Sequence, residues 1–398
     1  MKNFTITALE NGLDNVQGFY CNAVNAGLRP DKEQGDVAFI RSEVLCDISA
    51  VFTRNTFQAA PIRHFQKYPQ GFQTDFVLIN AKNANAMTGP KGIEDIDTIM
   101  STLRNKLNVT NPVMSSTGVI GYRLPVDKIT SAFDTLDFNA SNSDKAARAI
   151  MTTDSFKKEL AYRVELDNGE HFTIAAICKG AGMINPAMAT MLCFITTDAD
   201  IPKKDMDELL LEGTEHSFNR ISVDGDTSTN DTVMLLANKR SGAYNKEAFA
   251  EALKQIMFEL AMMILKDGEG ANKLVAFEVK GALTVEEAQK ASMALSNSLL
   301  VKTALFGEDP NWGRIASTIG ASGIACDERK LTIHYDDLLI YSDAFRELDA
   351  EREERAYRIM KQEQFRVTCD IGLGEASYTS YGCDLSYEYV KINAEYRT

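Results

Sequence analysis

A single threonine, Thr190, stands where a loop of small residues meets an apolar run in the stretch KGAGMINPAMATMLCFITTD (179–198). A threonine hydroxyl is a poor nucleophile at neutral pH, and the sequence offers no G-x-S-x-G elbow or evident His–Asp pair to activate it. If the bond between Ala189 and Thr190 were cut, Thr190 would carry a free α-amine. Such an amine has a pKa of about 7.7–8.0, which suits a general base near neutrality. Nucleophile and base would then share one residue.

The cut needs no protease if the Thr190 hydroxyl attacks the carbonyl of Ala189 and water hydrolyses the resulting ester. Strain in a tight turn and hydrogen-bond donors aimed at the developing oxyanion would favour that attack. Gly180, Gly182 and Pro186 suit such a turn, and the small Ala189 side chain leaves its carbonyl accessible. Taken alone, the pattern is more typical of a threonine that merely opens a β-strand.

The elements around this loop are predicted from periodicity. The apolar runs 172–178 and 191–196 flank it as β-prone segments, and residues 76–80 (FVLIN) and 273–279 indicate further strands. Apolar residues at helical spacing predict a helix over 248–265. Mixed strands and helices of this kind imply sheet layers covered by helices.

Three further segments carry helix signals. Thr284 with Glu287 three residues later predicts an N-terminus for a helix that runs to about residue 300. Ser143 is a plausible N-cap for a helix that ends near residue 151. The charged run 349–358 (DAEREERAYR) indicates a solvated helix face.

Composition excludes several functions. The formal charge is −14, from 42 Lys+Arg and 56 Asp+Glu, and such an acidic chain is a poor phosphate-backbone binder, so nucleic acid is not expected as a partner. No apolar run approaches the ~20 residues of a membrane helix, and the start lacks a signal-peptide pattern, so a cytoplasmic protein without membrane contact is expected. Seven dispersed cysteines without a CxxC pair predict reduced thiols, and four isolated histidines give no support for a metal site.

The string KGAGMINPAMATML closely resembles the self-cleavage segment of the ornithine acetyltransferases, the bifunctional glutamate N-acetyltransferases of arginine biosynthesis. Further blocks resemble that family in the same order along nearly the whole chain: VFTRNTFQAAP (51–61), INAKNANAMTG, MSSTGVIG (114–121), IMTTD (150–154), ISVDGDTSTNDTV (221–233), KDGEGANK, GEDPNWGRI and CDLSYEYVKINAEYRT (383–398). One departure is Asn185-Pro186-Ala187, where many relatives read more like Ala-Pro-Asn. The residues Lys179, Gly180, Ala189 and Thr190 are unaffected.

The resemblance implies an α+β fold of the amino-terminal-nucleophile type, an αββα layered sandwich of two β-sheets between helical layers. It also implies that cleavage yields an α chain (1–189) and a β chain (190–398), which together form one catalytic unit. Two such pairs would associate as an α2β2 heterotetramer. No cofactor is implied.

The implied reaction is ping-pong. N2-acetylornithine acetylates Thr190, ornithine leaves, and L-glutamate takes the acetyl group to become N-acetylglutamate. Thr117 and Gly118 match the family's oxyanion-hole pair, a hydroxyl and a backbone amide. Without the family match, a Ser/Thr-Gly pair would be read as an ordinary turn.

The resemblance also implies a set of substrate-binding residues. Lys179 could pair with a substrate carboxylate and Glu269 with the cationic end of ornithine. Either Thr152 or Thr153 matches a hydroxyl contact, and the sequence does not decide between them. Asn393 and Thr398 match tail positions that fold back to the pocket. By residue type alone these would be a surface lysine, a helix-stop acid and a frayed tail.

Two alternatives stay open at this point. A related self-cleaving aminopeptidase or amidase would pass its acyl group to water instead of to an amine, and an uncleaved, noncatalytic ligand-sensing protein could keep the same fold. Within the acetyltransferase interpretation, no block decides whether acetyl-CoA serves as a second acetyl donor.

Overall fold

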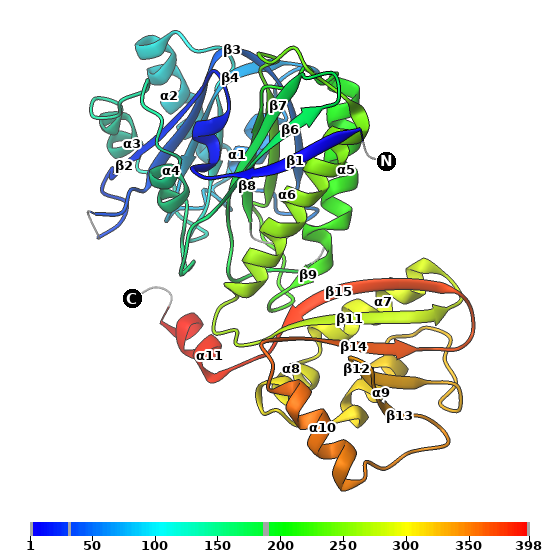
Figure 1. Cartoon of the computed structure of the whole chain (residues 1–398). Coiled ribbons are helices and arrows are strands. Elements are labelled where there is room, and N and C mark those ends of the chain that lie inside the picture. The colour runs from blue at the N-terminus through cyan, green and yellow to red at the C-terminus, as the bar shows by residue number, and fades with distance from the viewer. Residues whose placement is uncertain (1–2, 31–32, 186–190, 396–398) are drawn as a thin grey trace. The chain divides into compact units, whose positions relative to one another are not determined.

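The computed structural model describes residues 3–30, 33–185 and 191–395, which divide into two units (Figure 1). The first comprises Met1–Gly180, Ala187–Asn219 and Thr227–Ala261, and the second comprises Ala181–Pro186, Arg220–Asp226 and Met262–Thr398. Each unit has its own β-sheet with helices packed on it. The α+β class predicted from the sequence is therefore confirmed.

The sheet of the first unit has the order β1-β6-β7-β8-β10-β3-β4-β5, with β2 also paired to β3. Its strands are β1 (Phe4–Leu9), β2 (Phe19–Val24), β3 (Val37–Phe52), β4 (Gln73–Asn80), β5 (Val113–Ser116), β6 (Lys158–Leu166), β7 (His171–Lys179), β8 (Leu192–Thr197) and β10 (Thr232–Ala237). Its helices are η1 (Gly12–Asn15), α1 (Ala60–Phe65), α2 (Gly89–Leu107), α3 (Val126–Ala132), α4 (Ser143–Ala149) and α5 (Lys203–His216), with most of α6 (Lys246–Lys266), and η2 (Phe218–Arg220) follows α5.

The long strand β3 lets this sheet form two layers. Its first half pairs with β2 and β4 and its second half with β10, with a register shift between Arg41 and Cys46. Alternate residues of both layers share one core, which includes Ala38, Ile40, Val77, Ile79, Ile177, Phe194 and Met234. This alternation is the period-two pattern of strands.

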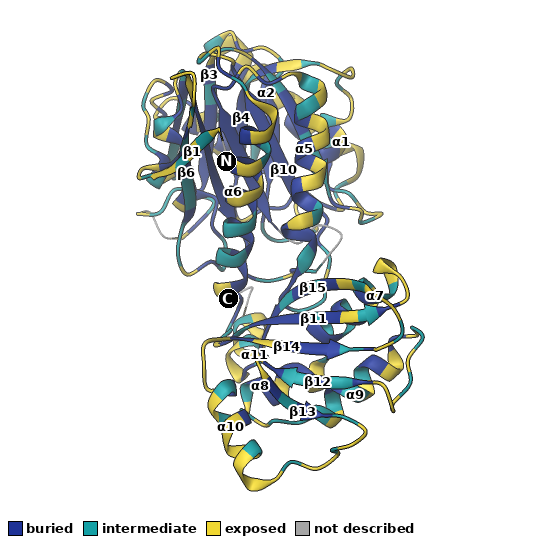
Figure 2. Ribbon diagram, turned by 45° about the vertical axis from the view of Figure 1, so that its right-hand side comes forward, coloured by how far each residue is buried: buried dark blue, intermediate teal, exposed yellow. Residues whose placement is uncertain are grey.

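Helices cover the outer faces of the two layers. Phe39, Phe76 and Leu78 point away from the shared core and pack with Ile96 and Met100 of α2. On the other side, Phe172 of β7 lies 5.7 Å from Phe249 of α6, between ring centroids. Helices α2 and α3 thus flank one layer and α5 and α6 the other, as the predicted αββα arrangement requires (Figure 1). The labelled strands β4 and β10 are largely buried (Figure 2).

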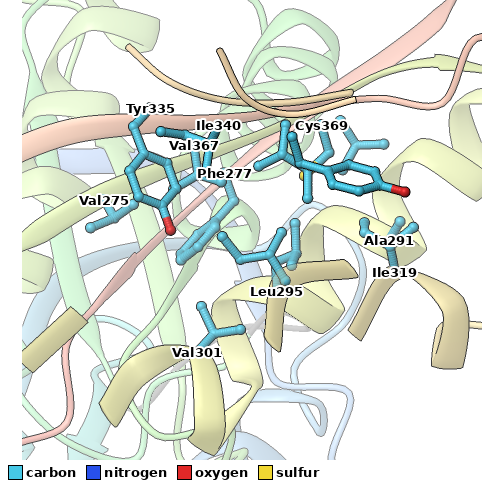
Figure 3. Packing of buried hydrophobic residues seen from close by; sticks show 14 of the residues in the cluster. Val275, Phe277, Ala291, Leu295, Val301, Ile319, Tyr335, Ile340, Val367 and Cys369 are labelled. Atoms are coloured by element: carbon cyan, nitrogen blue, oxygen red, sulfur yellow. The ribbon is translucent and has the colours of Figure 1, made fainter. Parts of the chain in front are cut away.

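The second unit has a sheet of order β13-β12-β14-β11-β15-β9. Its strands are β9 (Ile221–Ser222), β11 (Leu274–Ala282), β12 (Thr332–Tyr335), β13 (Leu338–Tyr341), β14 (Gln364–Asp370) and β15 (Ala376–Cys383). Its helices are α7 (Val285–Asn297), α8 (Leu299–Phe306), α9 (Trp312–Ala321), α10 (Ala350–Met360) and α11 (Tyr387–Ala394). The core joins strand residues such as Phe277 and Val367 to Leu295 of α7 and Ile319 of α9 (Figure 3).

Most local predictions are confirmed, with two corrections. The helix that begins after Thr284 does so with the Thr284 hydroxyl accepting the Glu287 amide at 3.2 Å, but it ends at Asn297 instead of about residue 300. Ser298 adopts an extended conformation and caps the next helix, α8, by accepting the Val301 amide.

The second correction concerns the cap of α4. Asn142, not Ser143, is the N-cap, and its side chain accepts the Lys145 amide at 2.9 Å. The Ser143 hydroxyl is occupied elsewhere, because it accepts the Leu13 amide and donates to Glu159.

Candidate active site

The residues on either side of the predicted cleavage point lie at the ends of neighbouring strands in the first unit. Lys179 ends β7 and pairs with Leu192 of β8, and Leu192 in turn pairs with Thr232 of β10. Met191 and Asp231, each one residue before its strand, therefore lie side by side at this edge of the sheet. The pairing of β8 with β10 thus brings together two residues that are far apart in sequence.

Asp154 connects three parts of this edge. Its Oδ1 accepts hydrogen bonds from Lys158 Nζ and from the Gly180 amide, each at 2.7 Å, and its Oδ2 accepts the Thr152 amide at 2.9 Å. Burial alone would raise the pKa of Asp154, but the charges of Lys158 and Lys179 outweigh it and hold the pKa below its ordinary value. The carboxylate fixes both the 152–154 turn and the start of the glycine-containing segment.

Lys179 is buried, with 2% of its surface exposed. Its Nζ donates to Thr152 Oγ1 at 3.4 Å, and within the described ranges no carboxylate forms an ion pair with it. Burial lowers the pKa of Lys179 against the opposing influence of Asp154 and Asp231. A ligand that supplies a carboxylate here could form the ion pair that Lys179 does not make with any described residue.

Thr152 and Thr153, between which the sequence does not decide, differ in their contacts. Thr152 contacts Lys179, whereas in the part of the chain that the structure describes Thr153 has no comparable contact. Thr152 is therefore the hydroxyl that accompanies Lys179.

The predicted oxyanion pair follows β5. Thr117 donates its amide to Asn80 and Val119 donates its amide to Lys82, while the Gly118 amide between them makes no hydrogen bond to another described residue. Gly118 has a φ of 132°, and an added Cβ would lie 2.2 Å from the Lys82 carbonyl carbon. Only glycine fits this close approach, and an unused backbone amide is what an oxyanion donor requires.

Asn230 ties this turn to the neighbouring loop. Its Nδ2 donates to the carbonyl oxygens of Ala84 and Ser116, at 2.7 and 2.8 Å. Asn230 precedes Asp231, so the segment before β10 holds the loop that carries Thr117.

In the second unit, Glu269 and Asn393 are brought together. Asn393 Nδ2 donates to Glu269 Oε2 at 2.7 Å, and the Glu269 amide donates to the Ala181 carbonyl at 2.9 Å. An added Cβ on Gly182 would lie 2.4 Å from the Glu269 carboxyl carbon, so glycine permits this packing. Two of the predicted substrate residues thus form one pair beside the segment that leads to the cleavage point.

The same segment is fixed up to residue 185. Asp224 accepts the amides of Met183 and Ile184 at 2.6 and 2.9 Å, and Asn297 Nδ2 donates to Asn185 at 3.3 Å. Ala189, Thr190 and Thr398 lie outside the described residues, so their predicted roles stay predictions.

Sequence reasoning missed Asp231. It is completely buried, and burial raises its pKa well above the ordinary value, against the lowering effects of the Met191 amide and Lys179. A polar TND string directly before the apolar run TVMLLA was the available signal. Among the described residues no cluster of three or more His, Cys, Asp or Glu side chains could hold a metal ion. In the same residues, no helix is long and apolar enough to cross a membrane.

Comparison with known proteins decides the family. The model of the ArgJ family matches residues 20–398. The chain belongs to the ArgJ family. It is 55% identical over 396 residues to the arginine biosynthesis bifunctional protein ArgJ of Wolinella succinogenes, covering 99% of this chain and all of that protein. The glutamate N-acetyltransferase of Methanothermobacter thermautotrophicus is 40% identical and covers 88% of this chain and 90% of its own.

Two solved structures of the family match part of the chain. The ArgJ chain from Bacillus halodurans is 34% identical, covers 50% of this chain and 96% of its own, and gives a TM-score of 0.47. The ornithine acetyltransferase of Mycobacterium tuberculosis, solved with ornithine, is 28% identical. It covers 46% of this chain and 98% of its own, and gives a TM-score of 0.40. Family membership confirms the resemblance seen in the sequence and makes the chain an acyltransferase of arginine biosynthesis that acts on small molecules.

Proposed function

We propose that the chain cuts itself between Ala189 and Thr190 and then uses Thr190 to move an acetyl group from N2-acetylornithine to glutamate. The observation that carries this proposal is the buried Lys179 beside Thr152, at the strand end that leads into the cleavage segment. The names of the relatives, which state arginine biosynthesis and glutamate N-acetyl transfer, support the choice of substrates.

In the cleavage step, the Thr190 oxygen forms an ester with the Ala189 carbonyl carbon while the peptide C–N bond breaks. The nitrogen takes up the hydroxyl proton and becomes an α-amine. Water then hydrolyses the ester, which leaves Ala189 with a carboxylate and restores the Thr190 hydroxyl. The Ile184 amide before the cut and the Met191 amide after it each donate a hydrogen bond to an aspartate.

In the transfer step, the Thr190 hydroxyl attacks the acetyl carbonyl of N2-acetylornithine and its own α-amine accepts the proton. The Gly118 amide and the Thr117 hydroxyl stabilise the tetrahedral oxyanion. The proton passes to the leaving amine and ornithine departs. Glutamate reverses these steps with its α-amine and leaves as N-acetylglutamate.

Substrate orientation follows from the charges. Both substrates carry an α-carboxylate, which suits Lys179 and Thr152. The cationic side chain of ornithine suits Glu269, which Asn393 holds in place. The remaining predicted contact is the terminal residue, Thr398.

We further propose acetyl-CoA as a second acetyl donor, because the relatives' names describe bifunctional proteins. It would acetylate Thr190 in the same way, with the thiol of coenzyme A as the leaving group. Assembly as an α2β2 heterotetramer is proposed with it.

Intact-mass spectrometry of the wild type and of Thr190→Ala tests the proposal. We expect two fragments that begin at Met1 and Thr190 in the wild type and one 44.0 kDa chain in the variant. Addition of N2-acetylornithine should then increase the mass of the second fragment by one acetyl group, and glutamate should remove that group. An uncut wild type would contradict the mechanism, and rapid loss of the acetyl group to water without glutamate would favour an amidase.

A further inference from the structure

Asp231 has one carboxyl oxygen in use and one without a partner. Its Oδ1 accepts the Met191 amide at 3.2 Å. Its Oδ2 is buried and has no hydrogen-bond partner among the described residues. A buried polar atom without a partner is unfavourable and needs a physical reason.

The position of Asp231 beside Met191 suggests why Oδ2 has no partner. Asp231 lies beside Met191 because β10 runs parallel to β8 with Thr232 opposite Leu192. The nitrogen of residue 190 is one residue away from the Met191 nitrogen, at most about 3.6 Å along an extended chain. Cleavage before residue 190 converts that nitrogen from a peptide amide into an amine.

We propose that Asp231 is a positioning residue for the amine released at Thr190, with Oδ1 holding the Met191 amide and Oδ2 accepting a hydrogen bond from the new α-amine. This inference rests on the self-cleavage proposed above. Burial raises the pKa of the Asp231 carboxyl, which favours its neutral form before cleavage. Once the amine exists, the carboxyl proton can pass to it, which leaves a carboxylate beside an ammonium group and changes no other bond. Above its pKa the ammonium group loses that proton to solvent, and the free amine then serves as the general base of acetyl transfer.

The surroundings of Asp231 are compatible with this charge. Lys179 faces it from β7, and Lys179 in turn faces Asp154 and Lys158. The hydroxyl groups of Thr53, after β3, and Ser228, before β10, lie near the carboxyl group and lower its pKa, which favours the charged form. A carboxylate at Asp231 would thus lie between Lys179 and the new amine, and it would raise the pKa of that amine.

Asp231→Asn tests the inference, with Asp198→Asn as the matched control. Asp198 is also buried, also has a pKa raised by burial and also accepts a backbone amide, from Thr173 at 2.7 Å, but it follows the opposite end of β8. Two quantities are measured on the full chain: the rate at which the two fragments appear, and the pH profile of kcat/KM for acetyl transfer per cut molecule.

In Asp231→Asn the amide Nδ2, a donor, replaces the acceptor Oδ2 proposed to face the nitrogen that leaves as an amine, so we expect cleavage to slow about tenfold or more. The acidic limb of the pH profile of the cut molecules should move about one pH unit lower. Asp198→Asn should leave both the cleavage rate and the position of the acidic limb unchanged. Wild-type cleavage with an unmoved acidic limb in Asp231→Asn would overturn the inference.

If Asp231→Asn yields no cut molecules, the inference is tested by whether Asp231→Glu recovers cleavage. Because Glu keeps the carboxyl group, partial recovery of cleavage supports the inference, and failure to recover in a variant with wild-type thermal stability overturns it. The proposed function fails separately, since an uncut wild type would be seen before any Asp231 variant is compared.

Discussion

Asp154 is the residue whose loss should affect stability most at the candidate site. Its carboxylate and the Lys158 ammonium are 2.7 Å apart and both side chains are fully buried. Removing one partner of such a pair costs about 3–5 kcal/mol. We expect Asp154→Asn to lower the free energy of unfolding by this amount, measured by urea denaturation in a Thr190→Ala background so that each chain is uncut. Asp144→Asn, which weakens half-exposed pairs with Arg148 and Lys157, should cost about 1 kcal/mol or less.

The same residue predicts a pH dependence. The folded-state pKa of Asp154 lies below its ordinary value, so its stabilising contribution is fully present above the unfolded-state pKa of about 3.9 and is lost as the pH falls through the folded-state pKa. The difference in stability between wild type and Asp154→Asn should therefore be constant from pH 7 to about pH 5 and shrink below about pH 4. A difference that grows on acidification would contradict an ionised Asp154.

Lys179→Met tests the proposed carboxylate contact. Methionine keeps most of the side-chain volume but removes the ammonium group, so a charge-assisted hydrogen bond of about 1.5–3 kcal/mol is lost. We expect kcat/KM for acetyl transfer to fall about tenfold to a hundredfold, mainly through KM. Thr152→Val should show a smaller effect in the same direction, and Thr153→Val should show little. Equal effects of the two threonine variants would contradict the role of Thr152.

At the scale of elements, sequence patterns predicted the helix features that depend on residues close together in the chain. The periodicity of 248–265 and the Thr284 cap are confirmed by α6 and α7, because side-chain spacing and capping act within a few residues. The break at Ser298 was missed because it separates two helices that read as one apolar pattern. The Asn142 cap was missed because Ser143 is engaged by Leu13 and Glu159, contacts that only the tertiary fold creates.

At the candidate site too, the sequence pointed to residues within local motifs and missed a residue that the tertiary fold brings close. The family blocks drew attention to Thr117, Gly118 and Lys179. They did not reveal Asp231 beside Met191, since the parallel pairing of β10 with β8 leaves no local pattern in the sequence. Of the predicted substrate residues, Lys179 lies with Thr152 in the first unit and Glu269 with Asn393 in the second.

Asn230 provides a prediction for the loops between elements. Asn230→Ala would leave the buried carbonyls of Ala84 and Ser116 without their donor, at a cost of about 1–3 kcal/mol, and would release the turn that carries Thr117. We expect kcat for acetyl transfer to fall at least tenfold in this variant. The matched control is Asn238→Ala at the other end of β10, where Nδ2 donates to Gln17. It should lower stability by a similar amount while kcat stays within about twofold; equal losses of kcat would show that general destabilisation is responsible.

At the scale of the whole molecule, the two predicted chains share one sheet. Strands β8 and β10 follow residue 190, and they lie between β7 and β3, which both precede residue 189. Each of these two strands therefore has an α-chain neighbour: β8 pairs with β7 and β10 pairs with β3. Withdrawing the second chain would expose the backbone edges of β7 and β3, which is strongly unfavourable.

Cleavage should therefore leave the two fragments joined under native conditions. We expect fragments 1–189 and 190–398 to co-elute in size-exclusion chromatography and to separate only in denaturant. Because the cut protein must bring two chains together to rebuild β7–β8 and β10–β3, its refolding after dilution from urea should depend on protein concentration. Uncut Thr190→Ala, in which the same strands belong to one chain, should form the paired sheet at a rate independent of concentration. Separation of the cut fragments in native buffer would contradict the interleaved strand order.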